Sequence, residues 1–301
     1  MAQAIILSDL TKRYGGSKTL AVDGLSLSIN AGEVFGFLGS NGAGKSTTIR
    51  MIMNFLQPTS GSATILGRDS VRDSVELKRH MGYLAGDVAL YHRVTGGQML
   101  DYLGKLQGRQ DTVYLRTLVQ RFDAQLDKPI SQLSKGNRQK IGIIQAFMHQ
   151  PDVLILDEPT SGLDPIMQER FYETVAEAKA RGAAVFLSSH SLSDVQRMCD
   201  HVAIIRNGKL VRTGTLADFA DQTPTFEVTF IGDVPKNLAA ERALEVLGTK
   251  DRIATIKPRG GIAETLAALS KFQTIANLQT SQQELEEEFM SYYNEEDKPN
   301  V

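Results

Sequence analysis

The sequence predicts an α/β fold, in which helices flank a mixed sheet, and three observations lead to this class. A short apolar run, residues 33–38, precedes a glycine-rich loop and a helical stretch at residues 45–56. A second apolar run, residues 153–156, ends in two carboxylates, and such a run is typical of a parallel strand buried on both faces. A third run, residues 183–187, follows a helical stretch at residues 166–180. Strands and helices therefore alternate along the chain, as they do around a parallel sheet.

The composition fits a chain with one large and one small domain, because 301 residues exceed the usual size of a single domain. The 33 Lys and Arg residues nearly balance the 35 Asp and Glu residues, and a net charge of −2 gives no argument for a nucleic-acid partner. The single cysteine, Cys199, fits a reducing compartment. No stretch approaches about 20 uninterrupted apolar residues, so we expect that the chain does not span a membrane by itself, which leaves docking onto a membrane protein open.

A glycine-rich loop at residues 39–47 matches Gly-x-x-x-x-Gly-Lys-[Ser/Thr], the pattern of a phosphate-binding P-loop. Glycines let successive backbone N–H groups point at phosphate oxygens, and the positive end of the following helix faces the same oxygens. Lys45 adds a positive charge, and the Ser46 hydroxyl suits a hard cation such as Mg²⁺. A chance match is the alternative, which the strand before the loop and the helix after it disfavour. The predicted contact residues are Gly39, Ser40, Asn41, Gly42, Ala43, Gly44, Lys45, Ser46 and Thr47.

An aromatic side chain, Tyr14, lies upstream of this loop between strands expected at residues 4–7 and 25–29. A tyrosine in that position can stack on a nucleobase, and Val22 can pack beside it. Tyr14 as an ordinary half-buried aromatic residue remains the alternative.

The middle of the chain, from about residue 86 to 150, is predominantly helical. Thr95 and Asp111 are expected to cap its first two helices. We expect a helical insertion between the two halves of the α/β core. The elements expected before it are strands 62–66 and 81–84 and a helix at residues 71–80.

A second candidate anion site lies at residues 133–139, where a helix that runs through residue 148 begins. Ser134 and the backbone of Gly136 lie at the positive end of that helix, which can bind an anion. A serine that only caps the helix explains the same pattern.

Acidic and imidazole side chains follow two of the predicted parallel strands. Asp157 and Glu158 end one of them, and His190 follows another. Ligands of open α/β sheets bind at the carboxyl ends of strands, so these groups are expected near the glycine-rich loop. There Asp157 can support a metal ion, Glu158 can activate a water molecule, and His190 can sense a phosphate, although a lone histidine is more often structural.

In their order and spacing these motifs resemble the nucleotide-binding subunit of an ATP-binding cassette (ABC) transporter, over roughly residues 4–218. The resemblance implies an ATPase that uses ATP and Mg²⁺, with a P-loop NTPase cassette core that carries an antiparallel β subdomain and a helical insertion. It also implies roles for the residues named above. Tyr14 would stack on adenine, and Lys45, Ser46 and Thr47 would contact the phosphates and Mg²⁺. Asp157 would bind the metal through water, Glu158 would act as catalytic base, and His190 would contact the γ-phosphate.

The resemblance further implies a head-to-tail dimer, in which Ser134 and Gly136 complete the nucleotide site of the opposite protomer and Asp164 crosses the interface. Two copies then enclose two nucleotides, and loss of the γ-phosphate loosens the pair. The expected partners are a second copy of the chain and polytopic membrane permease subunits, and no nucleic acid. The expected location is the cytoplasmic face of the cell membrane.

Two positions depart from the family pattern. Lys135 stands where the first glycine of Leu-Ser-Gly-Gly-Gln is usual, which resembles the subset of bacterial drug and antibiotic exporter subunits. Gly86 stands where a Gln or Glu usually helps to ligate Mg²⁺, and a glycine has no such side chain. Asp87 or an additional water molecule is the expected substitute, with modestly weaker metal binding.

The predicted domains are a nucleotide-binding domain at residues 1–220 and a small α+β accessory domain at residues 221–301. In the second we expect strands at residues 226–230, 252–256 and 272–278, helices at 238–247 and 262–269, and a final helix from Ser281. The expected function is that of an exporter ATPase subunit. The alternatives are a non-transport cassette ATPase of the translation or DNA-repair type and a regulatory cassette with impaired hydrolysis.

Overall fold

The computed structural model describes residues 2–88, 91, 93–108, 111–219, 225–272 and 274–280. The chain divides into two compact units, Met1–Leu216 and Ala217–Val301, which are described separately. Within the described residues, none of the helices has the length and apolar character needed to cross a membrane.

A six-stranded, mostly parallel sheet forms the centre of the first unit, in the order β10-β9-β3-β8-β7-β6. Its parallel pairs are β9 with β3, β3 with β8, β8 with β7, and β7 with β6. Every residue of β3, β7 and β8 is buried, which confirms the interpretation of their continuous apolar runs. The strands are β3 (Val34–Leu38), β6 (Met81–Leu84), β7 (Val153–Asp157), β8 (Ala184–Ser189), β9 (His201–Arg206) and β10 (Lys209–Thr215).

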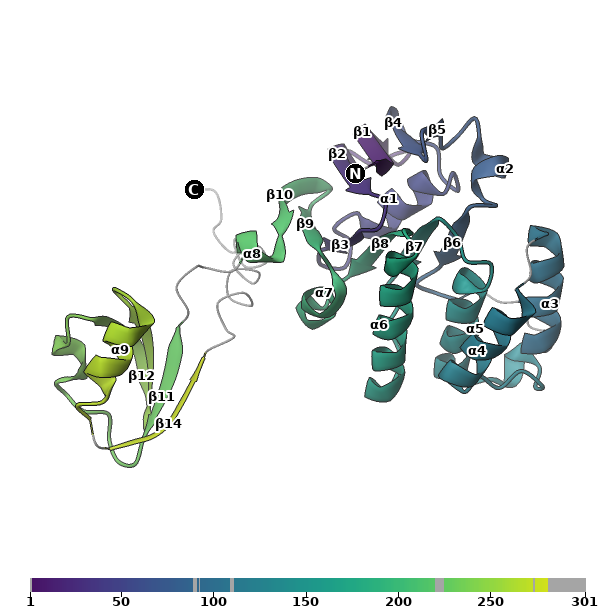
Figure 1. Cartoon of the computed structure of the whole chain (residues 1–301). Coiled ribbons are helices and arrows are strands. Elements are labelled where there is room, and N and C mark those ends of the chain that lie inside the picture. The colour runs from purple at the N-terminus through teal and green to yellow at the C-terminus, as the bar shows by residue number, and fades with distance from the viewer. Residues whose placement is uncertain are drawn as a thin grey trace. The chain divides into compact units, whose positions relative to one another are not determined.

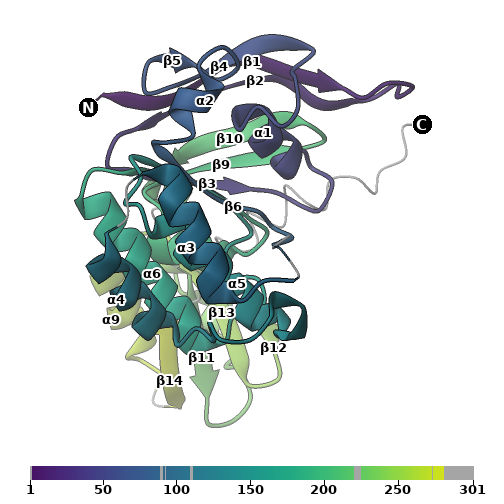
Figure 2. The same ribbon diagram turned by 90° about the vertical axis from the view of Figure 1, so that its right-hand side faces the viewer.

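An antiparallel sheet in the order β2-β1-β4-β5 forms a second layer, and helix α1 (Lys45–Ile52) lies between the two sheets (Figures 1 and 2). Apolar side chains of both sheets and of α1 make one core, which includes Leu7, Ile49 and Phe37. The Phe37 ring packs on Phe186 with a centroid distance of 5.3 Å. This core fixes the glycine-rich loop between two layers. The strands are β1 (Gln3–Arg13), β2 (Leu20–Asn30), β4 (Ser60–Ile65) and β5 (Arg68–Asp69).

The predicted helical insertion is present between β6 and β7, and both views show α3, α4 and α5 grouped away from α1 (Figures 1 and 2). Thr95 and Asp111 cap α3 and α4 as expected, and Thr95 forms a complete capping box with Gln98. Two helices are shorter than expected, because α1 ends at Ile52 and residues 71–80 hold one helical turn. The remaining helices are α2 (Ser74–Leu77), α3 (Gly96–Gln107), α4 (Thr112–Phe122), α5 (Lys135–Phe147), α6 (Pro165–Ala180), α7 (Leu192–Met198), α8 (Leu216–Phe219) and a 3-10 helix, Ile130–Gln132.

The second unit is a four-stranded antiparallel sheet in the order β12-β13-β11-β14, packed with helix α9. Counted along the chain this is order 2-3-1-4, the strand order of the ferredoxin-like split βαβ arrangement. Phe226, Val228 and Phe230 alternate into its core, as the pattern of residues 226–230 predicts. The elements are β11 (Phe226–Phe230), β12 (Leu244–Lys250), β13 (Ile253–Pro258), α9 (Ile262–Leu269), β14 (Ile275–Thr280) and a 3-10 helix, Leu238–Ala240.

The helix expected at residues 238–247 was wrong. Only Leu238–Ala240 makes a helical turn, and strand β12 begins at Leu244. Leu244 and Val246 face the core from alternate positions, and pairing with β13 satisfies the backbone. Tertiary packing therefore overrides the local helical tendency of this segment. The final helix expected from Ser281 lies outside the described residues.

Candidate active site

The glycine-rich loop joins β3 to α1 and needs glycine at two positions because backbone from other elements lies against it. A Cβ on Gly39 would lie 2.6 Å from the carbonyl oxygen of Ile205 in β9. Gly44 has a φ of 113°, and a Cβ there would lie 2.6 Å from the carbonyl oxygen of Ala21 in β2. Contacts from both sheets therefore impose the glycine spacing of the motif.

Lys45, the first residue of α1, lies between the glycine-rich loop and the acidic end of β7. Its side chain is only 6% exposed, and Nζ donates to the carbonyl oxygens of Gly39 (2.5 Å) and Ser40 (3.2 Å). The same Nζ lies 3.3 Å from Oε1 of Glu158. The ammonium group is therefore held next to the loop that the motif assigns to phosphate.

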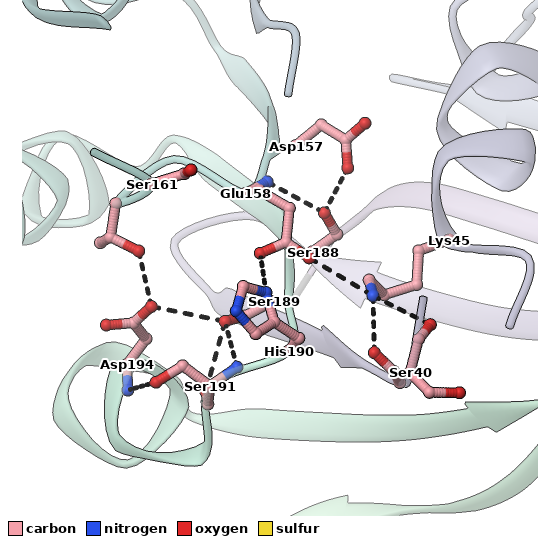
Figure 3. A network of polar contacts seen from close by, with 12 residues as sticks. Ser40, Lys45, Asp157, Glu158, Ser161, Ser188, Ser189, His190, Ser191 and Asp194 are labelled. Atoms are coloured by element: carbon pink, nitrogen blue, oxygen red, sulfur yellow. Dashed lines mark hydrogen bonds and ion pairs between the residues drawn. The ribbon is translucent and has the colours of Figure 1, made fainter. Parts of the chain in front are cut away.

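Ser188 of β8 joins the Asp157 carboxylate to the backbone of Glu158 at the end of β7 (Figure 3). The Ser188 hydroxyl donates to Oδ1 of buried Asp157 at 2.5 Å and accepts from the backbone N–H of Glu158 at 3.1 Å. Glu158 has a φ of 49°, which is uncommon for a residue other than glycine. The turn redirects the chain after the buried strand. Neither this turn nor the Ser188 contact was predicted from local sequence patterns.

His190 meets the other oxygen of the Glu158 carboxylate, with Nδ1 2.6 Å from Oε2 (Figure 3). A carboxylate only accepts hydrogen bonds, so Nδ1 carries the proton in this contact. Because Lys45 approaches Oε1, the Glu158 carboxylate is held between an ammonium group and an imidazole. The structure thus brings together three predicted catalytic residues from α1, the end of β7 and the end of β8.

Tyr14 lies over the start of α1, with its hydroxyl 3.2 Å from the Thr47 hydroxyl. It lines a cavity of about 750 Å³ that Gly42 of the glycine-rich loop also lines. Val22 is buried, and its Cγ2 would lie 3.4 Å from a Cβ on Gly44 of the glycine-rich loop. The cavity is also lined by residues that the sequence analysis did not predict, among them Leu20, Ala21, Asn207, Gly208 and Lys209. Gly208, in the turn between β9 and β10, donates its backbone N–H to the carbonyl oxygen of Ala43 at 2.9 Å, so this distant turn lies against the glycine-rich loop.

Ser134 and Gly136 lie at the start of α5, which packs on α3, α4 and β6, whereas α1 packs on β2 and β7. The Ser134 hydroxyl caps α5 by accepting from the backbone N–H of Asn137 at 3.2 Å, and the side chain is exposed. Asp164 caps α6 and is exposed as well. The exposed Ser134 and Asp164 thus mark the starts of α5 and α6 at the surface of the first unit.

The chain from Pro159 to Asp164 connects these two regions. At its start, the buried Gln139 side chain of α5 donates to the carbonyl oxygen of Pro159 at 2.8 Å. Lys135 lies over Gly162, and its Nζ is 3.4 Å from the Ser161 hydroxyl. The residue that departs from the family pattern thus ties the start of α5 to the loop that leads to Asp164.

Comparison with known proteins identifies the family. The family model described as "ABC transporter" matches residues 22–161. The ATP-binding protein NatA of an ABC transporter from Bacillus subtilis is 35% identical over 235 residues, which cover 75% of this chain and 96% of NatA. The chain belongs to the ABC transporter family.

Other members of the family give the same result. The bacitracin transport ATP-binding protein BcrA of Bacillus licheniformis is 37% identical, over 70% of this chain and 69% of BcrA. A solved structure of an ATP-binding subunit of an ABC transporter is 31% identical, with a TM-score of 0.67 over 72% of this chain and 91% of that chain. The chain is thus an ATP-binding subunit of an ABC transporter with ATPase activity. The expected α/β cassette core is confirmed.

Gly86, the departure from the ABC transporter pattern, lies directly beside Asp157. A Cβ on Gly86 would lie 3.3 Å from Oδ2 of Asp157, and its backbone φ is one that other residues adopt. Asp87 is exposed, and among the described residues no group of three or more His, Cys, Asp or Glu side chains forms a metal cluster. The position beside Oδ2 of Asp157 therefore carries no side chain.

Substituting Gly86 with Gln is expected to lower the Mg²⁺ concentration for half-maximal ATPase activity several-fold, because an amide oxygen beside Asp157 adds a ligand for a hard cation. The measurement is a Mg²⁺ titration of ATPase activity together with a Mg²⁺ titration of ATP binding. Gly86→Ala serves as control, since it adds the Cβ without a ligand. An unchanged Mg²⁺ dependence in Gly86→Gln would count against a metal position beside Asp157.

Proposed function

We propose that the chain powers an exporter from the cytoplasmic face of the membrane, through separate membrane subunits. The similarity to BcrA, a bacitracin transport protein, supports this assignment. So does Lys135, because the Leu-Ser-Lys-Gly form of the motif resembles that of exporter subunits. The proposed role of these residues in ATP hydrolysis rests on one observation, the Glu158 carboxylate held between Lys45 and His190.

In the proposed reaction, the glycine-rich loop holds the phosphates of ATP and Glu158 orients and deprotonates the attacking water. Lys45 and His190 stabilise negative charge that develops on the γ-phosphate. Tyr14 stacks on the base at the cavity beside the loop.

The oxygen atoms of Ser46 and Asp157 fit Mg²⁺, because both are hard ligands and Asp157 is buried with its Oδ2 beside the open position at Gly86. When bound, Mg²⁺ would neutralise charge on the phosphates. Ser188 holds the Asp157 carboxylate in place by its 2.5 Å hydrogen bond.

We propose a head-to-tail dimer as the active form, in which Ser134 and Gly136 bind the γ-phosphate held by the other protomer. The proposal rests on the different packing partners of α5 and α1 and on the exposed Ser134 at the N-terminus of α5. Asp164 would then lie at the interface. A two-fold arrangement of this kind closes with both nucleotide sites filled.

The surface proposed for the membrane subunit is an apolar hollow of about 430 Å³ on the helical insertion. Two of its aromatic residues, Tyr91 and Tyr102, are 63% and 57% exposed. Exposed aromatic side chains around an apolar hollow are typical of protein interaction sites. The hollow is lined by Tyr91, Arg93, Val94, Gln98, Met99 and Tyr102.

Substituting Tyr102 with Glu is expected to reduce binding to the membrane subunit at least about tenfold, since it places a charge at an apolar contact. The ATPase rate of the purified chain should stay unchanged. The measurement is co-purification of the tagged chain with the membrane subunits of its transporter. Val113→Glu is a matched control, because Val113 is 68% exposed on α4 and does not line the hollow. Equal recovery of the membrane protein with both variants would contradict this docking surface.

A further inference from the structure

A buried carboxylate behind the catalytic cluster, Asp194 of α7, connects three segments of the first unit (Figure 3). The residue is 7% exposed. Its Oδ2 accepts a hydrogen bond from the Thr160 hydroxyl at 2.6 Å, and its Oδ1 accepts one from the Tyr172 hydroxyl of α6 at 2.7 Å. The Ser189 hydroxyl lies 3.4 Å from Oδ2. Asp194 thus joins the end of β8, the chain after Glu158, and α6.

Both chain neighbours of His190 bond to this same residue. Ser189 contacts the Asp194 carboxylate, and the Ser191 hydroxyl accepts from the backbone N–H of Asp194 at 3.3 Å. Ser189 and Ser191 are also bonded to each other, with the Ser191 backbone N–H donating to the Ser189 hydroxyl at 2.9 Å. The backbone on either side of His190 is therefore anchored to one buried group.

The contacts form a closed ring around the catalytic pair. The chain runs from Glu158 to Thr160, Thr160 bonds to Asp194, Asp194 holds both neighbours of His190, and His190 returns to Glu158. Only one residue, Pro159, separates Glu158 from Thr160. The bond between Thr160 and Asp194 therefore links the chain after Glu158 to the turn that carries His190.

The chemistry of the ring favours a fixed geometry. A nearly buried carboxylate is costly unless its oxygens accept hydrogen bonds, and hydroxyl donors supply them here. Burial and the hydrogen bond to Asp194 raise the pKa of Tyr172, so its hydroxyl stays protonated and remains a donor. Losing one donor leaves part of the carboxylate unsatisfied, which the surrounding loops can relieve only by moving.

We propose that Asp194 is a positioning residue for ATP hydrolysis. It holds the turn that carries His190 and the chain after Glu158 in the relative position that the Glu158–His190 contact requires. The proposal rests on the catalytic roles proposed for Glu158 and His190. Asp194 itself touches neither nucleotide nor water in this assignment, and acts through Thr160, Ser189 and Ser191.

The test compares Thr160→Val with Thr160→Ser in the full chain. Valine matches the shape of threonine but lacks the hydroxyl, whereas serine keeps the hydroxyl. We expect Thr160→Val to lower kcat for ATP hydrolysis about tenfold with the KM for ATP within about twofold, and Thr160→Ser to keep kcat within about twofold of the original chain. Thermal unfolding of each variant reports on folding.

Several outcomes would overturn the proposal: an unchanged kcat in Thr160→Val, a rise in KM at constant kcat, or an equal loss in the valine and serine variants. If Thr160→Val does not fold, Tyr172→Phe replaces it, with an expected several-fold loss of kcat at constant KM and refutation by an unchanged kcat. A parallel measurement on Glu158→Gln distinguishes failure of the proposed base from failure of the role of Asp194. Normal turnover in Glu158→Gln would refute the proposed base. If Glu158→Gln is inactive but Thr160→Val keeps full activity, only the role of Asp194 is refuted.

Discussion

Glu158→Gln is expected to lower kcat for ATP hydrolysis at least about a hundredfold while ATP still binds. The glutamine amide keeps the size of the side chain but cannot accept a proton, and proton transfer by a positioned base contributes about 10² to 10⁴ in rate. The phosphate-binding loop and Lys45 are unchanged, so the affinity for ATP should stay within a few-fold. The substitution also removes the ion pair to Lys45, which frees the ammonium group for phosphate.

The measurement combines steady-state ATPase assays with equilibrium ATP binding and sedimentation of the purified chain. With Mg²⁺ and ATP, the Glu158→Gln chain should sediment as a dimer that persists, because the step that loosens the pair is blocked. Glu76→Gln is a suitable control, since Glu76 is a half-exposed residue of α2 that contacts Arg68, Arg79 and His80 and no residue of the site. Turnover at the original rate in Glu158→Gln would show that another group activates the water.

The elements that carry the site were predictable from sequence because their signals are local. The apolar run of β7 specifies a doubly buried strand, and Thr95 and Asp111 specify helix starts through their own side chains. The glycine spacing at residues 39–47 likewise reflects one loop. In each case a few adjacent residues contain the physical cause of the structure.

The features that sequence analysis missed depend on contacts between distant segments. Ser188 joins Asp157 to Glu158 from a neighbouring strand, and Asp194 reaches Thr160 across 34 positions of sequence. The segment from Leu244 was expected to be helical, yet its pairing with β13 decides in favour of a strand. Each outcome is set by packing partners that no local pattern shows.

In the proposed head-to-tail dimer, each nucleotide site is built from residues of two chains. Lys45→Ala removes the cation beside the phosphate loop, and Ser134→Arg fills the exposed start of α5 with a bulky cation. Each substitution is expected to lower ATPase activity at least about a hundredfold in its own homodimer, because both sites of that dimer lose an essential part. The two variants damage opposite halves of the proposed site.

Mixing these two inactive variants tests the shared site most directly. In a mixed dimer, one site combines the intact Lys45 of one chain with the intact Ser134 of the other. Random exchange gives mixed dimers in about half of the pairs, each with one complete site, so activity should return to about a quarter of the original rate. Activity that stays at the sum of the two inactive variants would contradict a nucleotide site built from two chains.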